Sequence, residues 1–208
     1  KRDIGIEPMA HLTCVGANRD EIARVLDDLR SQKIENILAL RGDPPAGTTT
    51  FVPVEGGFHH ANELIAFIRE HHDHFCLGAA CYPEGHPEAP NREADLANLK
   101  CKVDTGVDFL ISQLFFDNAD FFTFQERARR AGITVPIIAG IMPILSVGQI
   151  RRFTQMCGAK IPADLLRRVE AVEDDPEAAR QIGMYHSAQQ CLDLLRGGVA
   201  GIHFYTLN

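Results

Sequence analysis

The residues of this sequence best suited to chemistry stand within or directly after apolar runs, and all but one glycine carry polar side chains. They are His11, Thr13, Arg41, Gly42, Asp43, Tyr82, Gln113, His203 and Tyr205. Burying a polar group costs free energy unless the group has a partner, so a ligand explains such positions better than packing does. The pattern predicts a site for a small-molecule ligand.

These side chains need a framework, and the alternation of apolar runs with segments of helical period predicts a parallel sheet with crossover helices. The runs are near-continuously apolar, as in strands covered on both faces. The strands are predicted at 9–14, 36–40, 75–81, 107–114, 135–142 and 199–206. This is an α/β fold, predicted to form one domain over residues 1–208.

Helix signals fill the connections between the predicted strands. Asn18 and Glu21 resemble a capping box, and a second apolar stripe covers 58–68. Asp117 is placed to begin a further helix. After the fifth strand three helices are expected, over 147–156, over 163–172, and from Pro176 to the Gly197 and Gly198 pair. The irregular segments 42–57 and 83–91 follow strand ends, where α/β barrels bind ligands.

Composition narrows the function classes. The chain has 208 residues, 45% of them hydrophobic, and a net charge of −7 with Lys and Arg interspersed among acids, so no nucleic-acid partner is expected. No apolar run approaches the roughly 20 residues that cross a bilayer, and no membrane association is expected. The six cysteines lack close pairing, which favours buried thiols in a reducing cytoplasm.

Seven segments resemble the methylenetetrahydrofolate reductase family, in the family's order along nearly the whole chain. They are AHLTC at 10–14, LALRGDPP at 38–45, YPEGHPEA at 82–89, EADLANLKCKVDTG at 93–106, ISQLFFD at 111–117, GIMP at 140–143 and HFYTLN at 203–208. The resemblance implies a (βα)8 barrel of the TIM type, with about six of its eight units present. It also implies FAD bound across the carboxyl ends of the strands.

The resemblance assigns roles residue by residue. The residues implied to bind FAD are His11, Arg41, Gly42, Asp43, His60, Ala61, Ala80, Tyr82, His86, Asp95, Asn98 and Lys102. Ala61 and Ala80 match positions where a small residue lets the backbone approach the cofactor, and His60 stands where relatives often carry Tyr. The residues implied to bind folate and nicotinamide are Gln113, Gln149, Phe153 and Tyr205.

Asp43 is the implied catalytic residue. A carboxylate near the flavin ring would disfavour an anionic reduced cofactor and stabilise a cationic iminium form of the folate. The alternative is a turn residue ahead of Pro44 and Pro45, and Arg41 could form a structural ion pair instead of touching the cofactor.

The other assigned residues also have two interpretations. Asp95, Asn98 and Lys102 recur at helical spacing on one helix face, where they could meet hydroxyl and phosphate groups or form a surface network. The Gln113 amide could bond both edges of a pterin ring. Phe153 and Tyr205 could stack on substrate or belong to the core.

The remaining histidines predict no metal site. His71, His72 and His74 lie near a polar helix end, where a solvated face is the more common outcome, and they lack acids at ligand spacing. His186 is read as a helix-face residue and His203 as a core histidine.

The implied reaction is reduction of methylenetetrahydrofolate to methyltetrahydrofolate by NAD(P)H, in ping-pong order through FAD, by a homo-oligomer. The family's general acid, a glutamate on an earlier strand, has no counterpart in the chain. A catalytically inactive flavin- or folate-binding module is therefore an alternative. A phosphate-binding barrel that uses Gly197, Gly198 and Gly201 is another.

A polypeptide limited to these 208 residues is expected to bind flavin poorly and to turn over little, because two strand units of the barrel are absent from it. The check is to purify this polypeptide and assay folate reduction. Robust turnover would refute the expectation.

Overall fold

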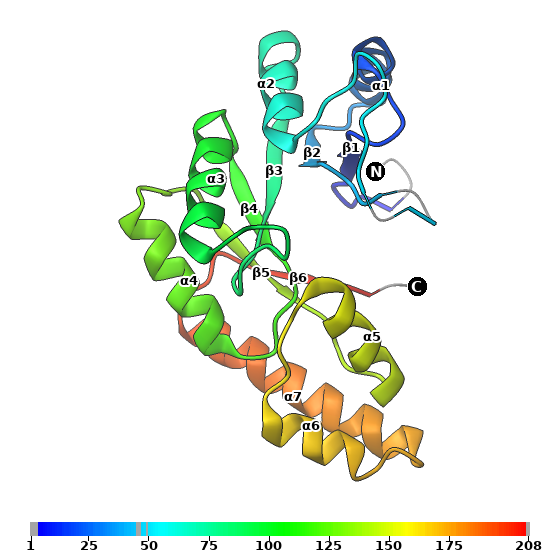
Figure 1. The fold of residues 1–208 in the computed structure, drawn as a ribbon, viewed down its shortest axis with the longest axis vertical. Helices are drawn as coiled ribbons and strands as arrows, with labels where there is room; N and C mark the ends of the chain where they lie inside the picture. The colour runs from blue at the N-terminus through cyan, green and yellow to red at the C-terminus, as the bar shows by residue number, and fades with distance from the viewer. Residues whose placement is uncertain (1–3, 45–46, 49, 207–208) are drawn as a thin grey trace. The chain divides into compact units, whose positions relative to one another are not determined.

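A computed structural model describes residues 4–44, 47–48 and 50–206 of the chain (Figure 1). Strands and helices alternate along the chain, and the strands follow one another in the sheet in sequence order. The chain divides into two compact units. The first unit comprises 1–80 and 101–110, and the second comprises 81–100 and 111–208.

The first unit is built on parallel strands with helical crossovers. Met9 of β1 pairs with Asn36 of β2, and Asn36 pairs in turn with Cys76 of β3, all in parallel register. Asp108, just before β4, donates its N–H to the Leu77 carbonyl oxygen of β3 (2.8 Å). The elements that begin in this unit are β1 (Met9–Thr13), α1 (Arg19–Ser31), β2 (Asn36–Leu40), α2 (Ala61–His71), β3 (Cys76–Cys81) and β4 (Phe109–Ser112).

The capping box predicted for α1 is confirmed. The Asn18 side chain accepts from the N–H of Glu21 at 3.0 Å, and the Glu21 carboxylate accepts from the N–H of Asn18 at 2.9 Å. These two bonds satisfy N–H groups that a helix start would otherwise leave without partners. Ile22 and Leu26 are then buried on the inner face of the helix.

The guanidinium of Arg69, on α2, links that helix to the starts of β3 and β4. It donates to the carbonyl oxygens of Gly106 (2.7 Å) and Phe75 (2.8 Å) and forms an ion pair with Asp108. The same Asp108 carboxylate accepts from the N–H of Leu77 at 2.7 Å. One side chain thus satisfies several polar groups at the amino ends of β3 and β4, whereas the predicted site lies at the carboxyl ends of the strands.

The second unit continues the alternation with α3 (Arg92–Asp104), whose first nine residues it contains. Gln113 donates its N–H to the Cys81 carbonyl oxygen (2.7 Å), which links the ends of β4 and β3, and β5 pairs with β6 in parallel. The cap predicted for α4 is confirmed, because Asp117 accepts the N–H of Ala119 in the first turn. The predicted start of α7 at Pro176 is also confirmed, and the preceding Asp175 accepts N–H groups of its first turn. The elements are α4 (Asn118–Arg130), β5 (Ile137–Ile141), α5 (Val147–Cys157), α6 (Ala163–Glu170), α7 (Pro176–Arg196) and β6 (Ile202–Phe204).

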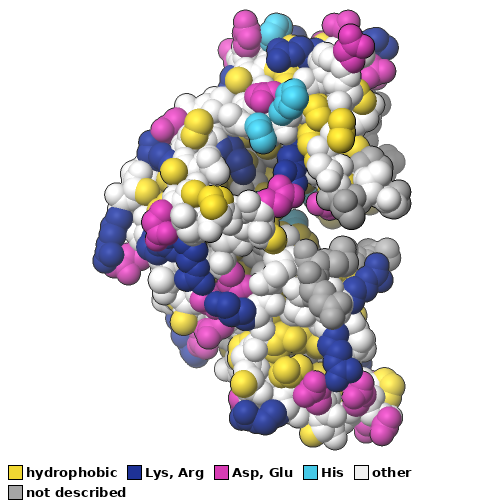
Figure 2. Space-filling view, in the orientation of Figure 1, with side chains coloured by type: hydrophobic (Ala, Val, Ile, Leu, Met, Phe, Trp, Pro, Cys, Tyr) yellow, Lys and Arg dark blue, Asp and Glu magenta, His cyan; other side chains and the backbone are white. Residues whose placement is uncertain are grey.

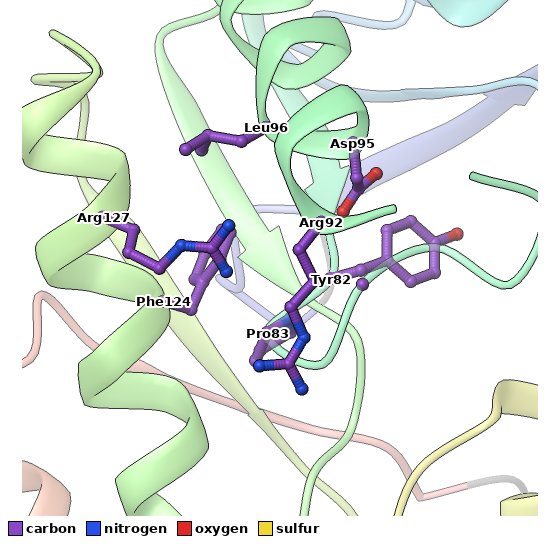
Figure 3. A pocket seen from close by; sticks show the side chains of 8 residues that line it. Tyr82, Pro83, Arg92, Asp95, Leu96, Phe124 and Arg127 are labelled. Carbon is purple, nitrogen blue, oxygen red and sulfur yellow. The ribbon is translucent and has the colours of Figure 1, made fainter. Parts of the chain in front are cut away.

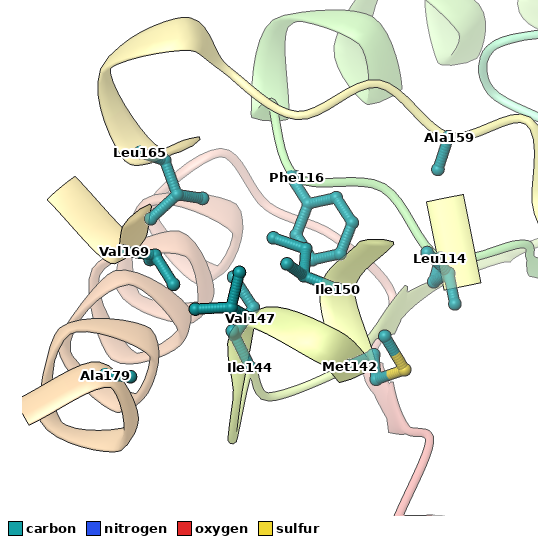
Figure 4. Packing of buried hydrophobic residues seen from close by; sticks show 10 residues of the cluster. All are labelled: Leu114, Phe116, Met142, Ile144, Val147, Ile150, Ala159, Leu165, Val169 and Ala179. Carbon is teal, nitrogen blue, oxygen red and sulfur yellow. The ribbon is translucent and has the colours of Figure 1, made fainter. Parts of the chain in front are cut away.

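The hydrophobic core of the second unit lies between α5, α6, α7 and the residues that follow β4 and β5 (Figure 4). Burial of these side chains removes apolar surface from water and fixes the helices against the strand ends. Gly183 lets α7 approach the backbone of Ile144 closely, because a Cβ at position 183 would lie 2.1 Å from the Ile144 carbonyl oxygen. The buried members are Leu114, Phe116, Met142, Ile144, Val147, Ile150, Ala159, Leu165, Val169 and Ala179.

The architecture confirms the predicted α/β fold of the TIM-barrel type, with six strands in the described part of the chain. The strand at 36–40 matches the prediction at both ends, whereas the others are shorter than predicted. Phe75, Val107 and Leu114 are buried, but they belong to the core rather than to a strand. Apolar patterning reports burial, and a strand ends where its backbone pairing ends.

β6 differs from the expectation of strands covered on both faces. None of its residues is fully buried, and the Phe204 side chain is 50% exposed. This strand stands last in the sheet order, with β5 beside it. The prediction of a single domain stays a prediction.

The surface carries both signs of charge. On the face shown in Figure 2, basic side chains (dark blue) and acidic side chains (magenta) are intermixed. None of the described helices combines the length and the apolar character that crossing a membrane requires.

Gly140→Ala is expected to destabilise the protein by about 1–3 kcal/mol through overpacking. A Cβ at Gly140 would lie 2.1 Å from the Ser112 carbonyl oxygen and 2.8 Å from the Tyr205 ring. Gly148→Ala is the matched control, because its Cβ would meet nothing within 4 Å. Urea unfolding of both variants checks this, and equal midpoints would contradict it.

Candidate functional site

In the first unit, residues 41–44, directly after β2, have no regular secondary structure. Gly42 has a φ of 86°, and a Cβ there would lie 2.6 Å from the Val15 side chain and 3.0 Å from that of Thr13. Glycine is therefore required by conformation and by space at this position. The Arg41 guanidinium lies 5.5 Å from the centre of the Phe51 ring, and the Asp43 side chain is exposed.

The neighbouring Cys14 thiol belongs to the interior. It lies 3.5 Å from the Leu40 carbonyl oxygen, and its backbone N–H donates to the Arg41 carbonyl oxygen at 3.0 Å. Burial raises the pKa of the Cys14 thiol to about 11, and the Glu63 carboxylate adds to this increase. The group is a neutral thiol near pH 7, which suits a structural role rather than a nucleophilic one.

Three further predicted FAD residues of this unit lie at element ends. The His11 side chain, on β1, is exposed. His60 is the N-cap of α2 and makes no side-chain capping bond, and Ala61 is buried behind it. These positions are compatible with a ligand, and their roles stay predictions.

Lys102, on α3, reaches the carboxyl end of β3. Its ammonium donates to the Ala80 carbonyl oxygen at 3.1 Å, so these two predicted FAD residues are in direct contact. A half-buried cation held at a strand end is suited to an anionic ligand group.

In the second unit, the structure brings Tyr82, His86 and Asp95 together. The rings of Tyr82 and His86 meet edge to face with centres 4.5 Å apart, and the N–H of His86 donates to the Asp95 carboxylate at 3.2 Å. The N–H of Glu88 donates to His86 Nδ1 at 3.1 Å, so a neutral His86 carries its proton on Nε2. Asn98, on the same helix α3 as Asp95, is exposed.

A small pocket opens beside this group (Figure 3). The Tyr82 ring and the Asp95 carboxylate line it together with the guanidinium groups of Arg92 and Arg127. Arg127 is also paired with Glu93 at 3.4 Å. The two guanidinium groups are donors that suit a phosphate, and the carboxylate is an acceptor that suits sugar hydroxyls beside the aromatic ring.

The predicted substrate residue Gln113 follows β4. Its side-chain oxygen accepts from the N–H of Leu114 at 2.9 Å. Its own N–H is held by the Cys81 carbonyl oxygen, so the backbone at this position is fixed.

Tyr205 follows β6 and lies over the ends of β4 and β5. Its hydroxyl donates to the Ser112 carbonyl oxygen (2.9 Å), and its N–H donates to the Ile141 carbonyl oxygen (2.9 Å). Burial raises the pKa of the Tyr205 hydroxyl above its ordinary range, and the neighbouring Cys81 and Tyr82 add to this increase. The hydroxyl is thus a neutral donor near pH 7, and the ring packs against the core cluster of the second unit, as the core alternative predicted. Its substrate role stays a prediction.

The two predicted substrate residues on α5 have structural contacts of their own. Gln149 accepts from the N–H of Leu145 at 2.6 Å and donates its backbone N–H to the hydroxyl of Ser146, which is the N-cap of α5. Phe153 packs against the core cluster of the second unit, with the Arg152 guanidinium 5.8 Å from the centre of its ring. Their substrate roles stay predictions.

Two functional candidates were missed from the sequence. Ser112 is fully buried, and its hydroxyl accepts from the N–H of Gly140 at 2.8 Å, while its carbonyl oxygen holds Tyr205. A serine within the apolar run at 109–116 was the available signal. Glu84 is the second, between Tyr82 and His86, and its carboxylate accepts from the N–H of Lys160.

The histidines and cysteines require two corrections. His72 was expected on a solvated face, but it is 8% exposed, and burial lowers its pKa. Cys101 is exposed, against the expectation of buried thiols, because its position on α3 faces outward. His186 lies on α7, with Nε2 3.0 Å from the Phe116 carbonyl oxygen, and His203 meets Tyr205 edge to face at 4.7 Å. No cluster of three metal-ligating side chains occurs in the described residues.

Comparisons with known proteins agree with the motifs. The family model for methylenetetrahydrofolate reductase matches residues 1–208. The chain is 41% identical to methylenetetrahydrofolate reductase (NADH) 1 of Zea mays, with 98% of the chain and 36% of that protein covered. It is 39% identical to 5,10-methylenetetrahydrofolate reductase of Escherichia coli, with 98% of the chain and 67% of that protein covered. The chain therefore spans about a third of the maize protein and two thirds of the bacterial one.

A solved structure shares the fold. It is an uncharacterised protein from Clostridium thermocellum, described as binding two copies of 5-methyl-5,6,7,8-tetrahydrofolic acid. The TM-score is 0.62 at 16% identity, and the match covers 100% of this chain and 69% of that protein. At this identity the similarity supports the fold alone.

Tyr205→Phe is expected to lower the free energy of unfolding by about 1–2 kcal/mol, because the buried Ser112 carbonyl oxygen loses a donor. Tyr185→Phe is the matched control, since that side chain is 60% exposed on α7. Chemical denaturation of both variants measures the difference. Equal stabilities would show that the Tyr205 bond is not formed in solution.

Proposed function

The chain belongs to the methylenetetrahydrofolate reductase family, and on that premise we propose that the intact protein reduces methylenetetrahydrofolate with NAD(P)H through bound FAD. The observation that carries the proposal is the position of the family's motif residues. Asp43 follows β2, Ala80 lies near the end of β3, Gln113 follows β4 and Tyr205 follows β6. Carboxyl ends of parallel strands are where barrel enzymes bind their substrates.

The residues present fit the cofactor by their chemistry. In the second unit, Tyr82, His86 and Asp95 are assembled beside the guanidinium groups of Arg92 and Arg127, a set that suits a diphosphate and ribose. In the first unit, the Lys102 ammonium donates to the Ala80 carbonyl oxygen and supplies a positive charge for an anionic group. Gly42 has no side chain, so none lies between its backbone and a ligand. The residues proposed to hold FAD are His11, Arg41, Gly42, Asp43, His60, Ala61, Ala80, Tyr82, His86, Asp95, Asn98 and Lys102.

FAD, when bound, supplies a ring that accepts a hydride from a nicotinamide and donates one to a folate. The protein contributes orientation and electrostatics. The Gln113 amide is proposed to bond the pterin edge, and its fixed backbone limits the positions that the amide can take. The exposed Asp43 carboxylate is proposed as the catalytic group that favours the cationic iminium form of the folate.

Both substrates are proposed to use the same residues in turn, which is a ping-pong order. Gln113, Gln149, Phe153 and Tyr205 would bind the nicotinamide first and the folate after it has left. The aromatic rings of Phe153 and Tyr205 offer flat surfaces that accept either ring system. The homo-oligomer stays a prediction.

The proposal is tested with the intact protein, purified without added cofactor. An absorbance spectrum is expected to show bound flavin, anaerobic NADH or NADPH is expected to bleach it, and methylenetetrahydrofolate is expected to restore it. A colourless protein would count against the proposal. A flavin that is bleached but not restored by the folate would favour a binding module instead.

Asp43→Asn is expected to slow restoration of the flavin spectrum by methylenetetrahydrofolate about a hundredfold, because the variant lacks the charge that stabilises the iminium. The rates are compared per bound flavin, because Asp43 is also among the residues proposed to hold FAD. Asp73→Asn is the control, as Asp73 is an exposed carboxylate in the turn between α2 and β3. Stopped-flow absorbance measures the rates, and a wild-type rate in Asp43→Asn would refute the catalytic role.

A further inference from the structure

Glu84 stands inside the loop that carries two proposed FAD residues, yet its side chain contacts a different segment. Tyr82, Pro83 and Gly85 line the pocket of the second unit, whereas Glu84 does not. Both of its carboxylate oxygens accept from the N–H of Lys160, at 3.2 and 2.9 Å. The bond joins segments that are 76 residues apart in the sequence.

The environment of Glu84 disfavours the charged form of its carboxyl group. The carboxyl group is half-buried, and burial raises its pKa. The neighbouring Asp120 carboxyl group raises the pKa further, whereas the Lys160 N–H and ammonium lower it. The Glu84 carboxyl group thus has two partners, the Asp120 carboxyl group and the Lys160 N–H, and it accepts the N–H with both of its oxygens. Truncating Glu84 would remove the acceptor of this N–H.

The segment that Glu84 holds is the end of α5. Gly158 terminates this helix in the left-handed conformation, with a φ of 68°. Pro87, which follows Glu84 in the same loop, lies near this helix end, because a Cβ built at Gly158 would be 3.6 Å from Pro87 Cγ. Ala159, between Gly158 and Lys160, is buried in the core cluster of the second unit.

α5 carries Gln149 and Phe153, the two residues proposed to bind substrate from this helix. We propose that Glu84 is a positioning residue that ties the flavin loop at 82–86 to the carboxyl end of α5 through the Lys160 N–H. It thereby holds the substrate residues of α5 in place relative to that loop. The inference rests on the proposed function, because it assigns a task within the same site.

The first test measures the contact itself and needs no turnover. In the intact protein, the Lys160 amide is expected to exchange its hydrogen about tenfold faster in Glu84→Ala than in the wild type. Glu84→Gln keeps the volume and one carbonyl oxygen, so it is expected to give intermediate exchange. Glu126→Gln is the matched control, since Glu126 forms an exposed ion pair with Arg130 within α4.

The second test separates positioning from general destabilisation. Glu84→Ala is expected to raise KM for methylenetetrahydrofolate about tenfold, with flavin content and kcat within twofold of the wild type. Glu84→Gln is expected to fall between the two and carries the test if the alanine variant does not fold. Glu126→Gln is expected to match the wild type in every measurement.

The outcomes are distinguishable. Wild-type KM and wild-type exchange of the Lys160 amide in Glu84→Gln and Glu84→Ala would overturn this inference and leave the proposed function standing. Loss of flavin in proportion to activity would also overturn it, because Glu84 would then only stabilise the cofactor loop. A wild-type protein without flavin or folate reduction would overturn the proposed function and this inference with it.

Discussion

The second unit depends on one constraint, which is that polar groups buried at strand ends must find partners. Ser112 meets this constraint twice, since its hydroxyl holds the N–H of Gly140 and its carbonyl oxygen holds the hydroxyl of Tyr205. The close approach is possible because residue 140 is glycine. The ends of β4 and β5 and the residue that follows β6 are thereby fixed to one another, and leaving any of these groups unpaired would cost about 1–3 kcal/mol.

The same constraint separates structural polar groups from those available to a ligand. Arg69 and Asp108 form an ion pair and also bond the surrounding backbone at the amino ends of β3 and β4. The Asp43 side chain, directly after β2, and the Asn98 side chain, on α3, are both exposed. A barrel-type fold can therefore carry a reaction at the carboxyl ends of its strands while contacts at the amino ends maintain stability.

Local signals made much of the fold predictable. The strand at 36–40, the caps formed by Asn18 and Asp117, and the helix start at Pro176 depend on residues within a few positions of one another, and the structure agrees with them. The bonds of Tyr205 to Ser112 and of Lys160 to Glu84 join residues 93 and 76 positions apart. No periodicity or spacing reports such pairs. The motifs indicated Tyr82, His86 and Asp95, and the structure adds that they touch.

We propose that Asp43, His86 and Lys102 serve one bound cofactor. A crystal structure of the intact protein with FAD tests it most directly. The account predicts cofactor density in contact with all three side chains, with the isoalloxazine nearest Asp43. Density bound elsewhere, or the three side chains on separate surfaces away from the cofactor, would contradict it.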